Sequence, residues 1–221
     1  MTVNRLVVFD CDGTLVDSQA NICLAMEEAF ARAGLVPPPR EDIRRIVGLN
    51  LVEAVATLIP EADPTLHRSM AKDYKDAFFT LRTSGRMDDE PLFDGIADLI
   101  ERLDAAGWLL GVATGKSDRG LLHVLERHGI RERFVTLQTS DRHPSKPHPA
   151  MLEAAIAEAG AAPHSTVMIG DTSYDIAMAH AGGTHALGVT WGYHAPEELV
   201  AAGAHGIARR SEDLWDHLEK L

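Results

Sequence analysis

The sequence predicts an α/β fold, a doubly wound parallel sheet with an inserted all-helical domain. Three observations predict it: short apolar runs without alternation, helical patterns between most of them, and one long stretch with helical patterns only. Continuous apolar runs are typical of strands that are buried on both faces of a parallel sheet. Alternation of such strands with helices is the pattern of a doubly wound sheet.

The predicted strands are the apolar runs at residues 6–9, 108–113, 134–137, 166–169 and 186–189. Helical periodicity fills the segments between the later runs. In residues 96–103, apolar side chains recur at i, i+3, i+4 and i+7, which places them on one helix face. Shorter patterns of the same kind predict helices around residues 121–125 and 151–156.

The stretch between the first and second strands contains no run that is typical of a strand. Its helical patterns lie at residues 22–33, 43–47, 51–59 and 66–81. We therefore predict a catalytic core made of residues 1–16 and 91–221, and a helical domain made of residues 17–90.

Composition excludes several classes of partner. The chain of 221 residues has a formal net charge of −12, which repels nucleic acid and anionic membranes. It contains no apolar run long enough to cross a bilayer, and its two cysteines indicate no disulfide framework. We expect a cytoplasmic protein without nucleic-acid or membrane partners. An anionic substrate would need locally positive groups in its site.

Two aspartates follow the first predicted strand. Asp10 stands at the carboxyl end of the strand, where open α/β sheets bind ligands, and Asp12 follows in a turn that Gly13 permits. A carboxylate pair in this place can divide its work, one attacking and the other transferring a proton. An Asp-rich turn also has a purely structural explanation.

The second predicted strand ends at Thr114 and Gly115, whose hydroxyl and backbone amide can hold a phosphoryl oxygen. The surrounding letters, G-x-x-x-G-K-S over Gly111–Ser117, are one residue short of a P-loop. Because the residues between the glycines also complete an apolar strand, we reject the P-loop interpretation.

Lys146 follows the third strand, and the nearby prolines at 147 and 149 restrict the backbone around it. It can supply the positive charge that an anionic substrate needs in so acidic a protein. Asp171 ends the fourth strand, and Asp175 follows four residues later, where a helix begins. Both carboxylates can approach one cation, and hard oxygen ligands suit Mg²⁺. Asp175 can equally be a helix-start residue that the helix dipole favours.

The order of these motifs, D-x-D-G-T, a strand-end Thr, Lys-Pro and G-D-x-x-x-D, resembles the haloacid dehalogenase (HAD) superfamily. The similarity covers essentially the whole chain. It is greatest to the group that contains phosphoglycolate phosphatases and β-phosphoglucomutases. The resemblance implies a HAD-like Rossmannoid core, and it implies that the helical insert is a cap domain over the site.

The resemblance also implies roles for the four aspartates. Asp10 would be the nucleophile and a metal ligand. Asp12 would be the general acid and base, and would give its backbone carbonyl to the metal. Asp171 would bind Mg²⁺, and Asp175 would bind it directly or through water.

Five further residues receive implied roles toward the substrate. Thr114 and the amide of Gly115 would bind the transferred phosphoryl group, and Lys146 would neutralise nucleophile and phosphate. Many phosphatases of this group have Asn where this chain has Gly115, so a side-chain contact is missing here. In the cap, Arg45 precedes the loop 47–50, which contains Gly48 and would face the core. Arg45 would bind a substrate anion, although a solvated helix face explains it equally well.

The predicted function is a Mg²⁺-dependent phosphatase that hydrolyses small phosphate monoesters of metabolites through an aspartyl-phosphate, as a monomer or homodimer. The enzymatic alternative is a sugar-phosphate mutase that uses the same aspartate pair. A receiver module of signalling proteins would be a non-enzymatic alternative, because it also combines acids, Thr and Lys around Mg²⁺. The motif order and the helical insert argue against the receiver.

Overall fold

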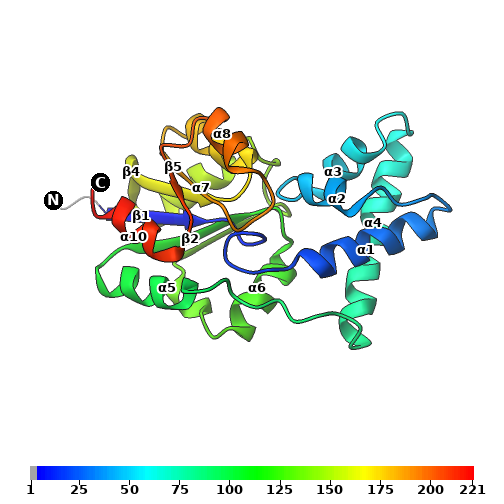
Figure 1. The fold of residues 1–221 in the computed structure, drawn as a ribbon, viewed down its shortest axis with the longest axis horizontal. Coiled ribbons are helices and arrows are strands. Elements are labelled where there is room, and N and C mark those ends of the chain that lie inside the picture. Colours follow the sequence, from blue (N-terminus) through cyan, green and yellow to red (C-terminus); the bar gives the residue numbers. More distant parts are fainter. Residues whose placement is uncertain (1–3) are drawn as a thin grey trace.

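The computed structural model describes residues 4–221 and contains a parallel sheet with helices on both faces and a separate group of helices beside it (Figure 1). The strand order is β3-β2-β1-β4-β5-β6, and every neighbouring pair is parallel. The strands are β1 (Asn4–Phe9), β2 (Leu109–Thr114), β3 (Thr136–Thr139), β4 (Ala161–Gly170), β5 (His185–Val189) and β6 (Gly206–Ala208). The predicted doubly wound α/β fold is confirmed.

The bounds of the observed strands differ from the predicted ones, most of all at β4, which begins at Ala161 and not at residue 166. Two further differences concern β3 and β6. Strand β3 begins at Thr136, because a 3₁₀ turn at Arg131–Arg133 precedes it and Phe134 fills the core from outside the strand. Strand β6 was not predicted. It has only three residues and pairs with β5 at the edge of the sheet, so its sequence carries too short a pattern to be noticed.

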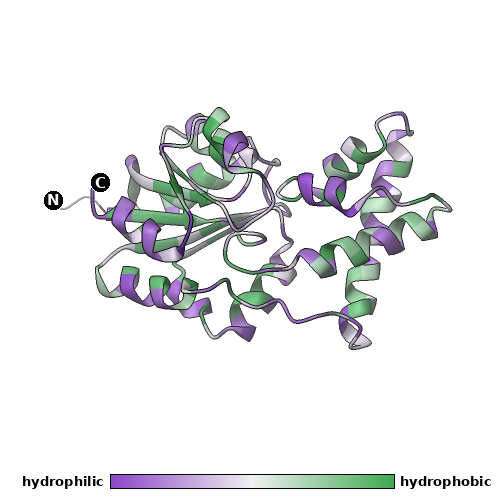
Figure 2. Cartoon of the chain, in the orientation of Figure 1, coloured by the Kyte–Doolittle hydropathy of each residue, from purple (hydrophilic) through white to green (hydrophobic). Residues whose placement is uncertain are grey.

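The two faces of the sheet carry separate hydrophobic cores, as alternation along β1 requires. Val7 and Phe9 pack on the side of α5 (Ile96–Ala105), α6 (Asp118–Arg127) and α10 (Ser211–Leu218). Leu6 and Val8 pack on the opposite side, against the helices α7 (Ala150–Ala159), α8 (Ser173–Ala181) and α9 (Pro196–Ala201). Figure 2 shows the strands as largely hydrophobic between helices of mixed hydropathy.

The remaining helices form a lobe beside the carboxyl edge of the sheet (Figure 1). They are α1 (Gln19–Arg32), α2 (Arg40–Arg45), α3 (Leu51–Leu58) and α4 (Pro64–Thr83), at the four segments with helical patterns. The lobe has its own core, in which Met26, Ile43 and Met70 are fully buried. The two crossings to the sheet lie side by side, since the amide of Asp17 donates to the carbonyl of Pro91 (2.9 Å). None of the helices in residues 4–221 combines the length and apolarity that a membrane span requires.

Candidate active site

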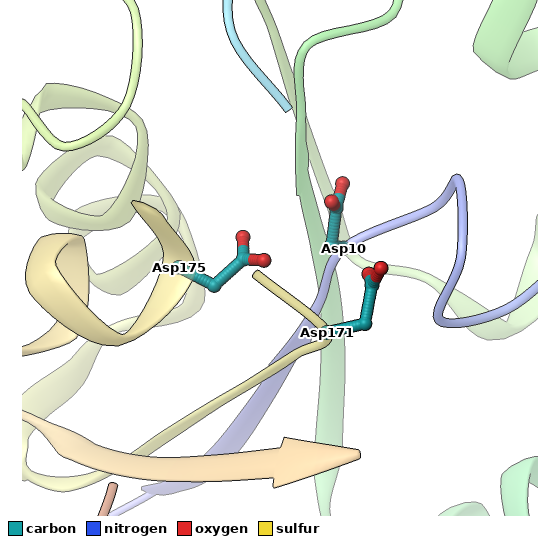
Figure 3. A group of neighbouring side chains, drawn as sticks. All are labelled: Asp10, Asp171 and Asp175. Carbon is teal, nitrogen blue, oxygen red and sulfur yellow. The ribbon is translucent and has the colours of Figure 1, made fainter. Parts of the chain in front are cut away.

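Three buried carboxylates meet at the carboxyl edge of the sheet. Asp10 directly follows β1, Asp171 directly follows the neighbouring β4, and Asp175 lies in the first turn of α8. One oxygen of each carboxylate lies within 4.8 Å of the others, and Figure 3 shows the three groups beside the ends of these elements. Adjacent parallel strands end at one edge, so their end residues are brought together by the sheet itself.

The electrostatics of this cluster favour a cation. Burial raises the pKa of Asp10 to about 7 against the opposing charge of Lys146, and burial also raises the pKa of Asp171 well above its usual value. The Oδ2 atom of Asp10 is buried and has no hydrogen-bond partner among residues 4–221. Three buried carboxylates beside a single lysine are compensated only in part, and one of their oxygens is unpaired, which fits a hard divalent cation with oxygen ligands.

Lys146 connects two members of the cluster. Its Nζ lies 3.0 Å from Oδ1 of Asp10 and 2.6 Å from Oδ1 of Asp175, and its side chain is fully buried. Burial alone would lower the pKa of Lys146, but the two carboxylates outweigh it and the net shift is upward, so the ammonium stays charged. Oδ2 of Asp175 accepts bonds from the amide and hydroxyl of Thr172. Asp175 is therefore both a helix-capping residue and a member of the cluster.

The carboxylate of Asp12 has a partner that the sequence analysis did not identify. Its Oδ1 accepts hydrogen bonds from the hydroxyl of Ser18 and from Nζ of Lys116, the latter at 2.6 Å. Desolvation lowers the pKa of Lys116, but the charge of Asp12 reverses this and the net shift is upward. In the sequence, Lys116 belongs only to the rejected P-loop pattern, which assigns it no role beside Asp12. Its place two residues after Thr114, at the same sheet edge, was the available signal.

Asp171 is held by groups from two distant segments. The hydroxyl of Thr14 donates to its Oδ1 (2.7 Å), and the amide of Tyr193 donates to its Oδ2 (2.9 Å). Gly13 has a positive φ of 81°, and a Cβ there would lie 2.3 Å from Oδ2 of Asp171. The turn after β1 therefore requires glycine. Trp191 packs against the core and donates from Nε1 to the carbonyl of Thr14 (3.2 Å).

A cavity of about 780 Å³ lies between the sheet edge and the helical lobe. Four of the predicted residues line it from the core, and Gly48 lines it from the lobe; the four are Asp10, Asp12, Thr114 and Gly115. Lys146, Asp171 and Asp175 lie behind this wall, completely buried.

The predicted role of Arg45 requires a correction. Arg45 does not line the cavity, because its guanidinium pairs with Glu198 of α9 on the outer surface. Its carbonyl also accepts a bond from Nε2 of His194 (3.1 Å). In this structure Arg45 fastens the lobe to the core, and the side chain is not available to a substrate in the cavity. Sequence spacing placed the residue near the site but gave no information on its direction.

Gly115 is the point where the lobe touches the end of β2. A Cβ at Gly115 would lie 2.9 Å from the carbonyl oxygen of Gly48 and 3.0 Å from that of Leu49. The amide of Asn50 donates to the hydroxyl of Ser145 (2.9 Å), which holds the same loop on the core. The missing side chain at Gly115 thus gives the loop 47–50 the space that it occupies.

We expect Gly115→Ala to displace this loop and to lower kcat/KM by about 5- to 150-fold, which corresponds to the cost of about 1–3 kcal/mol that is usual for overpacking. Gly115→Asn should have a larger effect, because its side chain is longer. The control is Gly182→Ala, which does not line the cavity; the new Cβ would lie 3.0 Å from Cδ2 of Leu152 and 3.5 Å from the carbonyl oxygen of Met178. Steady-state kinetics check the prediction, and equal kcat/KM values for Gly115→Ala and Gly182→Ala would contradict it.

The raised pKa of Asp10 predicts how metal binding depends on pH. The pKa of Asp10 shifts from 3.8 in the unfolded chain to about 7, so the metal-free folded protein binds a proton at Asp10 more tightly than the unfolded chain does. Binding of this proton stabilises the folded state, and the stabilisation is lost as the pH rises through 7. A cation can then take the place of the proton. We expect Mg²⁺ to raise the melting temperature more at pH 8 than at pH 5.5, relative to excess chelator. Thermal scans of wild type and Asp171→Asn test this, and a shift that is independent of pH would refute it.

Comparison with known proteins agrees with this geometry. The profile of the family described as haloacid dehalogenase-like hydrolase matches residues 7–189, and the chain therefore belongs to that family of hydrolases. This confirms the resemblance inferred from the motifs.

Particular relatives cover almost the whole chain. A probable phosphatase, IndB, of Dickeya dadantii is 34% identical over 89% of this chain and 86% of its own length. A phosphoglycolate phosphatase of Pasteurella multocida is 30% identical over 88% of this chain and 89% of its own length. The crystal structure of a predicted phosphatase from Clostridium acetobutylicum superposes with a TM-score of 0.89 at 25% identity, and both chains are fully covered.

Proposed function

We propose that this protein is a Mg²⁺-dependent phosphatase that hydrolyses small phosphate monoesters through a phosphorylated Asp10. One observation carries the proposal. Asp10 and Asp12 line the same cavity, and Asp10 also lies beside a buried lysine and two further buried carboxylates. Relatives that cover nearly the whole chain are named as phosphatases, which supports the same reaction class.

Asp10 is the proposed nucleophile. An oxygen of Asp10 forms a bond to phosphorus as the bond from phosphorus to the ester oxygen breaks. Two negative groups repel each other, and the ammonium of Lys146, 3.0 Å from Asp10, offsets part of this repulsion. A divalent cation held by Asp10, Asp171 and Asp175, with the backbone carbonyl of Asp12, would supply further positive charge to the phosphoryl oxygens when bound.

Asp12 is the proposed proton carrier. In the first step it gives a proton to the departing ester oxygen, and in the second it takes a proton from the water that cleaves the aspartyl-phosphate. Ser18 and Lys116 both bind Oδ1 of Asp12 and fix the direction of its carboxyl group. The hydroxyl of Thr114 and the amide of Gly115, which line the cavity at the end of β2, are the proposed ligands of the phosphoryl oxygens.

Residues 17–90 are proposed to act as a cap over this chemistry, with the core formed by residues 1–16 and 91–221. The lobe has its own hydrophobic core, and the backbone connects it to the sheet through two adjacent crossings, an arrangement that suits movement as a unit. Closure would exclude water while Asp10 reacts.

The test is release of inorganic phosphate from a panel of phosphorylated metabolites that includes 2-phosphoglycolate and sugar phosphates. We expect release with Mg²⁺ and none with excess chelator. Product analysis by ³¹P NMR separates hydrolysis from transfer of phosphate within a sugar, which a mutase would produce. A folded protein that binds Mg²⁺ and releases no phosphate from any ester in the panel would disprove the proposal.

A further inference from the structure

The cavity extends well beyond the catalytic residues. A volume of about 780 Å³ is in the range of pockets that hold drug-sized molecules, about 300–1,000 Å³. A two-carbon phosphate ester would occupy only a small part of it. Apolar side chains form much of the remaining wall, among them Ile22 and Met26 of α1 and Tyr74 and Phe78 of α4. The wall therefore favours a substrate with an apolar body.

Positive charge gathers in this cavity although the whole chain is acidic. Six basic residues line it, and three of them are lysines that pair with carboxylates. Lys116 pairs with Asp12, Lys72 with Asp76, and Lys75 with Asp141. The other three are arginines, namely Arg68, Arg82 and Arg119.

Arg82 and Arg119 line the cavity and can each bind an anionic group of a ligand. The Nη2 atom of Arg82 is buried and has no hydrogen-bond partner among residues 4–221; a carboxylate oxygen of Glu90 lies 4.0 Å from it. The guanidinium lies over the ring of Phe78, at 4.9 Å from its centroid. Arg119 of α6 lies over Phe79 at 4.4 Å and forms no ion pair within the part of the chain that the structure describes. At 4.0 Å, Glu90 compensates only part of the charge of Arg82. A guanidinium has five N–H donors, and the part of it that lines the cavity can therefore bind a ligand anion.

Phe78 lies close both to Arg82 and to Lys116, the partner of the proposed proton carrier Asp12. The Nζ of Lys116, which binds Asp12, lies 5.8 Å from the centroid of the Phe78 ring. Arg82 contacts the same ring, so one aromatic residue separates the proton carrier from the second cationic position. An aromatic body that lies in the cavity beside Phe78 would have its phosphate ester near Asp12 and its far end near Arg82.

We propose that the substrate is a phosphate monoester with an aromatic body and a second anionic group, which Arg82 and Arg119 bind at the distal end. The inference rests on the proposed phosphatase reaction and specifies its substrate class. The distal anion is a carboxylate or a phosphate, since a guanidinium binds either group.

The test compares kcat/KM for 4-carboxyphenyl phosphate, phenyl phosphate and 2-phosphoglycolate. We expect the carboxylated aryl ester to be the best of the three. Arg82→Gln should lower its kcat/KM by about 10- to 100-fold, the effect of one charge-assisted hydrogen bond, and that of phenyl phosphate by less than about threefold. Arg119→Gln, at an exposed position, provides a second variant in case Arg82→Gln does not fold. Arg86→Gln, just beyond α4 and outside the cavity, is the matched control.

A binding measurement makes the result independent of turnover. Calorimetry on Asp10→Asn with 4-carboxyphenyl phosphate should show binding that Arg82→Gln weakens and Arg86→Gln does not. Preference for 2-phosphoglycolate, or equal losses for the charged and uncharged aryl esters, would overturn the inference while the phosphatase proposal stands. Failure of the wild-type protein to hydrolyse any ester would instead refute the proposed reaction, and the calorimetry would still decide whether Arg82 binds the anion.

Discussion

Replacing Asp10 by Asn is expected to reduce phosphate release by a factor on the order of 10⁴ or more, as removal of a catalytic nucleophile does in other hydrolases. The amide has nearly the same shape as the carboxylate but cannot attack phosphorus. Because Asp10 lies in a buried acidic cluster, the change also removes one negative charge from that cluster. The metal-free variant should therefore melt at a higher temperature than the metal-free wild type at pH 8.

The measurement combines initial rates of phosphate release with thermal scans in excess chelator. Asp98→Asn is the matched control, since Asp98 is exposed in the first turn of α5, on a helix outside the cavity. It should keep wild-type activity and stability within a small factor. Activity of Asp10→Asn within tenfold of wild type would show that another residue forms the bond to phosphorus.

Replacing Lys146 by Met should remove activity and destabilise the fold together. Removal of one partner from a buried ion pair leaves an uncompensated charge and costs about 3–5 kcal/mol in the free energy of unfolding. Here the ammonium serves two buried carboxylates, Asp10 and Asp175. The same ammonium is proposed to offset repulsion during attack, so the residual activity should be at most about 1% of wild type.

Urea unfolding of Lys146→Met with excess chelator tests this at two pH values. The loss of stability should be larger at pH 8 than at pH 5.5, because Asp10, whose pKa is raised to about 7 by burial, can bind a proton at the lower pH. Mg²⁺ should restore part of the stability at pH 8. The control is Lys220→Met, at an exposed position near the end of the chain. Equal stability of Lys146→Met and wild type would show that the buried lysine does not compensate the cluster.

The sequence predicted the sheet and the acidic cluster for one shared reason. A strand that is buried on both faces has a continuous apolar sequence. Neighbouring parallel strands end at the same edge of the sheet, so the residues that directly follow them lie close together. Asp10 follows the run at 6–9 and Asp171 follows the run at 166–169, and the structure places these runs side by side as β1 and β4. The helical lobe could be located in the same way, because its helices each show an apolar face.

Only the tertiary structure decided which charged side chains face the cavity. Lys116 binds Asp12 across 104 positions of the chain, and Arg45 turns away to Glu198 across 153. Neither pairing leaves a periodic signal. Asp12 and Lys116 meet because β1 and β2 are neighbours in the sheet, whereas Arg45 and Glu198 meet where the lobe packs on the core. The contact between Gly115 and the loop 47–50 has the same origin. The sequence alone determined the elements and the residues at their ends, because these follow from local patterns. The directions of Lys116 and Arg45 depended on contacts with segments far away in the chain, which no local pattern records.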